Sequence, residues 1–176
     1  MKFTESALEE AIIELINKQD ISHIPGRNIN RELSDVLIKD DLKHFLELNY
    51  SKYEITNSEI ESIVRLLENK PASDLYESNK SIIKMLSDGF IFKREDRSEK
   101  DIFIELIDYS KEDNNIYKVV NQLEIIGFEK RKPDCILYIN GLPIVVFEFK
   151  TAIREEATIY DAYIQITTRY KRDIPE

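Results

Sequence analysis

Two carboxylates and one amine flank a short turn in the second half of the chain. Asp134 opens one apolar run, Glu148 and Lys150 close the next, and Asn140-Gly141 lies between the two runs. An Asn-Gly pair in this position is a strong hairpin signal. Because alternate residues of a strand share a face, Glu148 and Lys150 are expected to point the same way. The hairpin should therefore bring all three side chains to one edge of a sheet.

This combination of side chains is suited to hydrolysis of a phosphodiester. Mg²⁺ prefers oxygen ligands, so Asp134 and Glu148 are candidate metal ligands, together with the backbone carbonyl of Phe149. The metal would polarise the phosphate and activate a water. Lys150 would orient that water or stabilise charge in the transition state. The alternative is a hairpin whose ends form a salt bridge. Charges that end the apolar run PIVVFEFK are costly unless they are paired or bound to metal.

A third acid near this site is expected from the first helix. Glu5 and Glu9 are spaced so that both lie at the edge of an apolar face that contains Ile12 and Ile16. We favour Glu9 as a further metal ligand, while Glu5 and Glu10 compete with it. The alternative is that these acids are solvated surface residues.

The last helical segment carries a further candidate. Gln165 is followed by Arg169 and Tyr170, and its amide is suited to bind either the DNA backbone or the attacking water. The alternative is an ordinary polar helix face. Cys135 follows Asp134 in a strand and should point away from the site, so it is predicted to be a core residue and not a nucleophile.

The elements that position these residues change character along the chain. Helical periodicity dominates the first half and returns near the end, in segments 4–18, 30–49, 56–68, 78–86 and 155–171. Short runs rich in β-branched and aromatic residues dominate between them, in segments 102–109, 117–126, 134–139 and 143–149. We predict one α/β domain over 1–176: a first core helix (1–20), a mainly helical region (21–95), and a mixed sheet with the site and the following helix (96–176).

Composition narrows the function classes. The net charge of −9 argues against a protein that simply coats DNA, but a nuclease needs local acids to hold metal. The chain has no apolar run of about 18 residues and no basic-then-apolar start typical of a secretion signal. It has a single cysteine and no zinc-type cluster of Cys and His. A cytoplasmic protein without a membrane span is expected. With four glycines and no Gly-rich phosphate loop, ATP binding by these residues is not expected.

Through most of its length the chain resembles the N-terminal domain of the R subunit of type I restriction enzymes, the restriction and motor subunit. The resemblance is densest in three segments: LIDYSKEDNNIYKVVNQLEI (106–125), KRKPDCILYINGLPIVVFEFK (130–150) and YDAYIQITTRYKRDIPE (160–176). It implies a restriction-endonuclease-like, PD-(D/E)xK core and Mg²⁺-dependent cleavage of double-stranded DNA.

The same resemblance assigns roles to individual residues. Asp134 matches the PD aspartate, and Glu148 and Lys150 match the ExK pair. Gln165 and Tyr170 match a Gln–Tyr motif on the helix after the core. Tyr170 stands five residues after the glutamine, whereas related nucleases often space the pair by four, where this chain has Arg169. The resemblance carries Glu9 over as the acid of the first helix.

The resemblance also implies a larger protein. In that family the subunit continues into an ATP-driven translocase and then a region that joins the methyltransferase and specificity subunits. We therefore interpret the chain as the N-terminal piece of an ATP-dependent type I site-specific deoxyribonuclease, in which ATP is bound only by the missing motor region.

Two other functions are compatible with these residues. One is a different PD-(D/E)xK nuclease, such as a repair or junction-processing enzyme; a Walker-type motif encoded beyond Glu176 would favour the restriction subunit over it. The other is a catalytically inactive binding module, in which the site is a salt-bridged relic.

Overall fold

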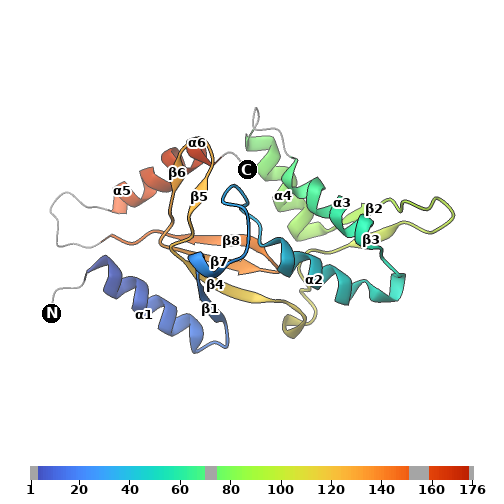
Figure 1. Ribbon diagram of the computed structural model, residues 1–176, viewed down its shortest axis with the longest axis horizontal. Helices are drawn as coiled ribbons and strands as arrows, with labels where there is room; N and C mark the ends of the chain where they lie inside the picture. Colours follow the sequence, from blue (N-terminus) through green and yellow to red (C-terminus); the bar gives the residue numbers. More distant parts are fainter. Residues whose placement is uncertain (1–3, 70–74, 151–158, 175–176) are drawn as a thin grey trace.

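The structure of this protein is a computed structural model that describes residues 4–69, 75–150 and 159–174 (Figure 1). Its α-helices are α1 (Glu5–Asn17), α2 (Lys39–Asn49), α3 (Asn57–Glu68), α4 (Leu75–Asp88), α5 (Ile159–Ile164) and α6 (Lys171–Asp173). A π-helical stretch, η5 (Gln165–Tyr170), joins the last two, and short 3₁₀ turns are η1 (Gly26–Asn28), η2 (Ser51–Tyr53) and η4 (Glu112–Asn114). The strands are β1 (Ser22–Pro25), β2 (Phe90–Phe92), β3 (Ile102–Ile104), β4 (Tyr117–Asn121), β5 (Ile125–Ile126), β6 (Lys130–Arg131), β7 (Cys135–Ile139) and β8 (Leu142–Phe147).

A four-stranded mixed sheet is the centre of the fold. Its order is β1-β4-β7-β8, with β1 parallel to β4 and the other neighbours antiparallel. The predicted Asn140-Gly141 turn joins β7 to β8, and both of its residues have positive φ, 51° and 76°. That conformation matches the twist of a tight hairpin. The expected mixed sheet flanked by helices is therefore confirmed.

Helices cover both faces of this sheet near the ends of β7 and β8. On one face Ile13 of α1 packs against Val119 and Cys135. On the other face Ile174, just after α6, packs against a cluster that includes Ile136. Figure 1 shows α1 and α5 on opposite sides of this end of the sheet. The residues that precede β7 and follow β8 thus lie between α1 and the helical elements at the end of the chain.

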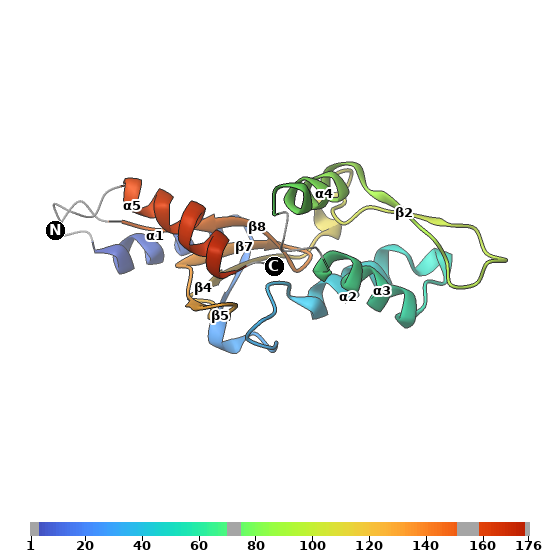
Figure 2. The same cartoon turned by 90° about the horizontal axis from the view of Figure 1, so that it is seen from above.

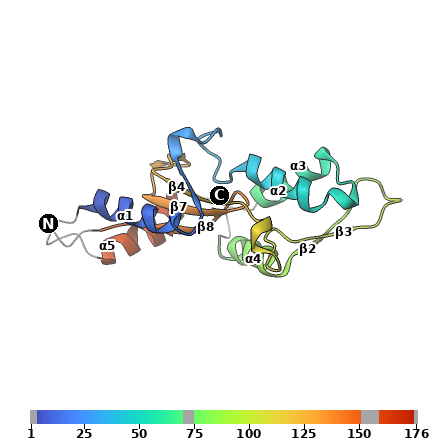
Figure 3. The same ribbon diagram turned by 90° about the horizontal axis from the view of Figure 1, so that it is seen from below.

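The helices α2, α3 and α4 form a second packing unit with the β2–β3 hairpin. Their shared core includes Phe45, Ile63 and Ile104, and it also takes in Leu142 from β8. Figures 2 and 3 show this lobe extending away from α1 and α5, with the β2–β3 hairpin at its far end. The Ile38 N–H donates to the carbonyl of Gly141 at 2.9 Å and ties the lobe to the hairpin turn.

Several predicted element boundaries were wrong within the described residues. The segment 30–38 is a loop and not the first part of a helix, because Arg31 donates to the backbone carbonyls of Asp35 and Glu124 and holds the chain in a turn. The mainly helical region also supplies β1, the edge strand parallel to β4.

The expected strands are also shorter than predicted. The one at 134–139 begins at Cys135 and the one at 143–149 ends at Phe147, so Asp134 and Glu148 flank these strands. The strand expected at 102–109 ends at Ile104, and the one at 117–126 is broken at Gln122, whose φ is 52°. Of the expected last helix, residues 155–158 lie outside the described part of the chain. Within the described ranges, no helix combines the length and apolar character needed to cross a membrane.

Candidate functional site

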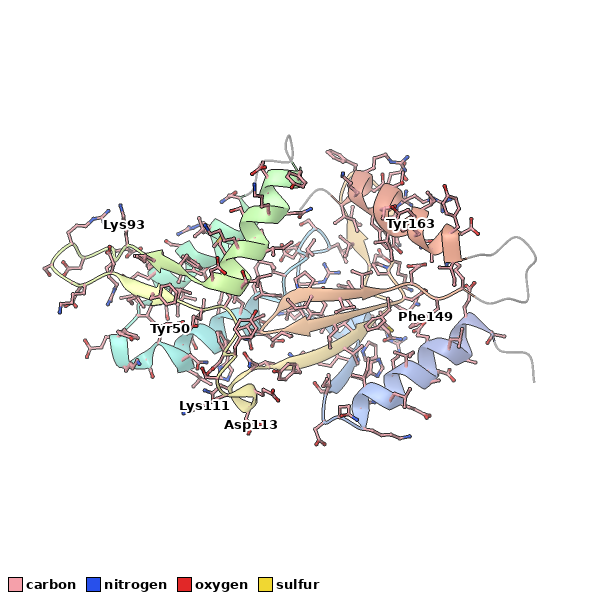
Figure 4. All side chains as sticks on the ribbon, turned by 180° about the vertical axis from the view of Figure 1, so that it is seen from behind. Tyr50, Lys93, Lys111, Asp113, Phe149 and Tyr163 are labelled. Atoms are coloured by element: carbon pink, nitrogen blue, oxygen red, sulfur yellow. The ribbon has the colours of Figure 1, made fainter. Side chains whose placement is uncertain are left out.

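The start of β7 and the end of β8 lie side by side. Their ladder pairs Cys135 with Phe147, so the next residues outward are Asp134 and Glu148. One further bond extends this pairing: the Phe149 N–H donates to Oδ2 of Asp134 at 2.7 Å. Figure 4 shows Phe149 where the chain leaves β8, between α1 and the continuous helix formed by α5, η5 and α6, called the C-terminal helix below. The backbone therefore holds Asp134 against the segment that carries Glu148 and Lys150.

Glu148 and Lys150 lie just beyond the end of β8, and their side chains are in contact. The Lys150 ammonium lies 3.0 Å from Oε1 of Glu148 and 3.1 Å from the carbonyl oxygen of Phe149. The Glu148 side chain is 3% exposed and that of Lys150 is 17% exposed. The Lys150 ammonium thus contacts two of the oxygen donors that were predicted for a metal ion, Glu148 and the Phe149 carbonyl.

Two side chains of η5 complete the surroundings of Glu148. The Tyr170 hydroxyl donates to Oε2 of Glu148 at 2.7 Å, and the Gln165 amide donates to Oε1. The same amide lies 2.9 Å from the Tyr170 oxygen. Including Lys150, Glu148 accepts hydrogen bonds from three side chains. A carboxylate held this firmly keeps one orientation.

The π-helical geometry of η5 explains the five-residue spacing of Gln165 and Tyr170. In a π-helix the backbone hydrogen bonds join residues five apart instead of four, so Gln165 and Tyr170 are neighbours on successive turns. Tyr170 is buried at 8% exposure, whereas Arg169 is exposed. The structure therefore places Tyr170, and not Arg169, next to Gln165.

Glu9 is the acid of α1 that reaches this region. Glu5 and Glu10 are exposed, while Glu9 is half-buried and accepts one amide hydrogen bond on each carboxylate oxygen, from Asn121 and Gln122. Its charge is close enough to Asp134 to raise the pKa of that carboxyl. Its role as a metal ligand stays a prediction.

Burial and nearby charges shape the ionisation of the site. Burial raises the pKa of the Asp134 carboxyl, the Phe149 N–H lowers it, and the negative charge of Glu148 raises it further. Burial also raises the pKa of the Tyr170 phenol, which keeps its proton available for Glu148. The Cys135 thiol is fully buried, and burial raises its pKa to about 12. The prediction that Cys135 is a core residue is confirmed.

Asp134 and Glu148 fit the oxygen preference of Mg²⁺ as a two-carboxylate pair. Within residues 4–69, 75–150 and 159–174, no group of three or more Asp, Glu, His or Cys is placed to hold a metal ion. Mg²⁺ commonly takes only one or two protein carboxylates and keeps several waters and substrate oxygens. Oδ2 of Asp134 accepts from Phe149, and the hydrogen bonds of the described residues leave Oδ1 without a donor. The donor set therefore suits a hard divalent cation.

An apolar cavity of about 630 Å³ lies beside the site but is not part of it. It opens between α4, β8 and the C-terminal helix, and its lining includes Ile82, Val146 and Ile174. The ring of Tyr170 faces this cavity, whereas Asp134 and Glu148 do not line it. The surface of this cavity is mainly apolar, so the paired carboxylates of Asp134 and Glu148 are the better candidate for chemistry.

Comparison with known proteins identifies the family. A family model described as "type I restriction enzyme R protein N terminus" matches residues 2–176. The chain belongs to this family.

Two relatives of this R protein N-terminal chain are named as endonuclease subunits of type I restriction enzymes. The HindI endonuclease subunit of a type I restriction enzyme from Haemophilus influenzae is 33% identical over 90% of this chain. The SsaAORF53P endonuclease subunit of a type I restriction enzyme from Staphylococcus saprophyticus is 25% identical over 96% of it. This chain spans 15% and 17% of the lengths of those two relatives.

Sequence reasoning missed Asn121, Gln122 and His23 as neighbours of the site. His23 contacts the Asn121 side chain, and Asn121 and Gln122 contact Glu9. Asn121 and Gln122 lie in the segment 106–125 that carries the resemblance, but the resemblance assigned no role to them, and His23 lies outside all three segments. The usable signal was the polar pair that follows the apolar run YKVV.

Proposed function

We propose that this chain is the nuclease part of a type I restriction enzyme R subunit and cleaves double-stranded DNA by Mg²⁺-dependent phosphodiester hydrolysis. The observation that carries the proposal is the convergence of Asp134, Glu148 and Lys150 at one end of the β7–β8 hairpin. Family membership supports it, because the relatives are named as endonuclease subunits. We further propose that the mixed sheet, with its site at a hairpin end, is a PD-(D/E)xK nuclease core.

Asp134 and Glu148 would hold the Mg²⁺, with the Phe149 carbonyl as a third oxygen donor. When bound, Mg²⁺ supplies positive charge that polarises a phosphodiester and makes a bound water more acidic. The Phe149 N–H keeps Asp134 in place from behind, through Oδ2. Gln165 and Tyr170 donate to Glu148 and fix its carboxylate plane. These contacts preorganise the acids before substrate arrives, which reduces the reorganisation needed during reaction.

Lys150 supplies a positive charge beside the proposed metal ligands. Its ammonium lies on the two oxygens that we assign to the metal, Oε1 of Glu148 and the Phe149 carbonyl. A flexible ammonium donates in several directions. Lys150 would orient the attacking water or stabilise the developing negative charge on the phosphate.

The remaining functions of the R subunit would lie outside these residues. We propose that ATP binding and DNA translocation belong to the rest of the longer protein. Its partners would be double-stranded DNA and the methyltransferase and specificity subunits of a cytoplasmic restriction-modification complex. The net charge of −9 fits this division of labour, because a motor would grip the DNA while the acidic edge of this chain acts on it.

The test uses the full-length protein that contains this chain, assembled with its partner subunits. Lys150→Ala should abolish DNA cleavage while ATP hydrolysis continues. Lys93→Ala is the matched control, because Lys93 is exposed on the β2–β3 hairpin, far from the site (Figure 4). Unchanged cutting by the Lys150 variant would reject the assignment and favour a salt-bridged hairpin without catalysis.

A further inference from the structure

Two consecutive amide side chains at the end of β4 hold one carboxylate. The Asn121 amide donates to Oε1 of Glu9 at 2.7 Å, and the Gln122 amide donates to Oε2 at 2.9 Å. Neighbouring residues of a regular strand point to opposite faces. Here they converge because Gln122 leaves the strand in the left-handed region, with a φ of 52°. Residues with a Cβ rarely adopt this region, so the contact is made against the usual backbone preference of a glutamine.

The same two residues are bonded to the start of β7 and to Asp134, which precedes it. Asn121 is the ladder partner of Cys135, and the Gln122 N–H donates to the carbonyl of Asp134 at 2.9 Å. The backbone that presents the amides to Glu9 is thus bonded to the residue that precedes β7. Glu9 and Asp134 therefore keep a fixed relationship.

His23 fixes the orientation of the first amide. Its Nε2 lies 2.8 Å from Oδ1 of Asn121. Because the Asn121 nitrogen donates to Glu9, the Asn121 oxygen faces His23 as an acceptor, and Nε2 must carry the proton. His23 of β1 thus donates to Asn121 of β4, and Asn121 donates to the Glu9 carboxylate on α1.

Glu9 is held without a cation. None of the ion pairs among the described residues includes Glu9. Gln122 bonds to both acids, since its amide donates to Glu9 and its backbone N–H donates to the carbonyl of Asp134, so two carboxylates are held in one region. The amides of Asn121 and Gln122 carry no charge, so they hold Glu9 in place without cancelling its repulsion of Asp134. A bound cation would relieve that repulsion. A contact that served only to dock α1 would not need this charge, since Ile13 already packs α1 on the sheet.

We propose that Asn121 and Gln122, with His23 behind Asn121, are positioning residues of the nuclease site. Their amides hold Glu9 as a fixed negative charge near Asp134, and this charge strengthens the attraction of the site for a divalent cation. The inference rests on the proposed nuclease function. It assigns a task to three residues outside the Asp134, Glu148 and Lys150 set.

Calorimetric titration of Mn²⁺ into the full-length protein, without nucleotide, tests the assignment. The binding that is lost in Asp134→Ala defines the site. Glu9→Gln and Asn121→Ala should each weaken that binding about tenfold, the usual effect of removing a residue that supports a metal ligand. The double variant should bind no more weakly than Glu9→Gln alone, because Asn121 acts through Glu9. Gln19→Ala is the matched control, because Gln19 is an exposed amide in the turn that follows α1.

The outcomes separate the two proposals. Unchanged Mn²⁺ affinity in both single variants, with binding still lost in Asp134→Ala, would overturn the positioning role and leave the nuclease assignment standing. An additive loss in the double variant would also overturn it, because the two residues would then act separately. Absence of any Asp134-dependent binding in the unmodified protein would instead reject the proposed function. If Asn121→Ala lowers the melting temperature strongly, Gln122→Ala and the isosteric Glu9→Gln carry the same test.

Discussion

The Tyr170 hydroxyl donates a hydrogen bond of 2.7 Å to Oε2 of Glu148. It does so from a position five residues after Gln165, because the intervening turn is π-helical. A regular α-helix would place the residue four positions on, Arg169, next to Gln165. Single π-helical turns are rare and often occur at functional sites. The extra residue in this turn is therefore tied to the candidate site.

Removal of the Tyr170 hydroxyl should slow DNA cleavage. Tyr170→Phe keeps the ring that lines the apolar cavity but deletes the donor to Glu148. A hydrogen bond to a charged group contributes about 1.5–3 kcal/mol, so the cleavage rate of the full-length protein should fall by roughly tenfold or more. Tyr163→Phe makes the same change on an exposed tyrosine of α5 and should cut normally. Equal rates for the two variants would contradict a supporting role for Tyr170.

The hairpin turn should tolerate no side chain at Gly141. Gly141 has a φ of 76°, and an added Cβ would clash with the carbonyl oxygen of Ile38. We expect Gly141→Ala to lower the free energy of unfolding of the 176-residue chain by at least about 2 kcal/mol in urea. Gly127→Ala is the control, because Gly127 does not have a positive φ. A loss as small as that of the control would mean that the turn does not set the alignment of β7 and β8.

The residues of the predicted site came together because local rules suffice for most of them. The Asn-Gly turn returns β8 beside Asp134, and the short segment after β8 brings Lys150 into contact with Glu148. These relationships span few residues and depend on no distant packing. The chemical roles of the side chains are a separate question, which the cleavage experiments address.

Features that depend on distant contacts could not be predicted. The support of Glu9 requires α1 to dock on the sheet and Gln122 to adopt a positive φ, and no propensity favours a glutamine there. The loop 30–38 has helix-like apolar spacing, yet Arg31 binds carbonyls as far away as Glu124. The strand β1 has only four residues and ends in Pro25, so its pairing with β4 decides its structure.

The C-terminal helix should loosen in acid through Asp173. Hydrogen bonds and charge from Arg172 and Arg131 lower the pKa of the Asp173 carboxyl to about 2. Since this is below the unfolded value of about 3.9, the ionised carboxylate stabilises the fold above that value. The contribution is lost as pH falls through the folded pKa. Asp173→Asn should therefore destabilise the chain at pH 6, and the difference from the unmodified chain should shrink between about pH 5 and pH 2.

Chemical unfolding of the chain across this pH range checks the Asp173 prediction. Asp113→Asn is the control, because Asp113 is exposed in η4 (Figure 4). The control should unfold like the unmodified chain at every pH. A pH-independent loss in Asp173→Asn would show that packing, and not the ionised carboxylate, accounts for the change.

Mg²⁺ should stabilise the folded chain through Asp134 and Glu148. A ligand that binds only the folded state stabilises that state, and the effect grows with ligand concentration. When the ligand concentration is ten times the dissociation constant, the gain in the free energy of unfolding is about 1.4 kcal/mol. The melting temperature of the unmodified chain should therefore rise with Mg²⁺ and return on chelation. Asp134→Ala should melt at the same temperature with and without Mg²⁺, while Asp113→Ala should respond like the unmodified chain. An equal rise in the Asp134 variant would place the bound ion elsewhere on this acidic protein, because a site that holds Mg²⁺ through Asp134 cannot keep its affinity without that carboxylate.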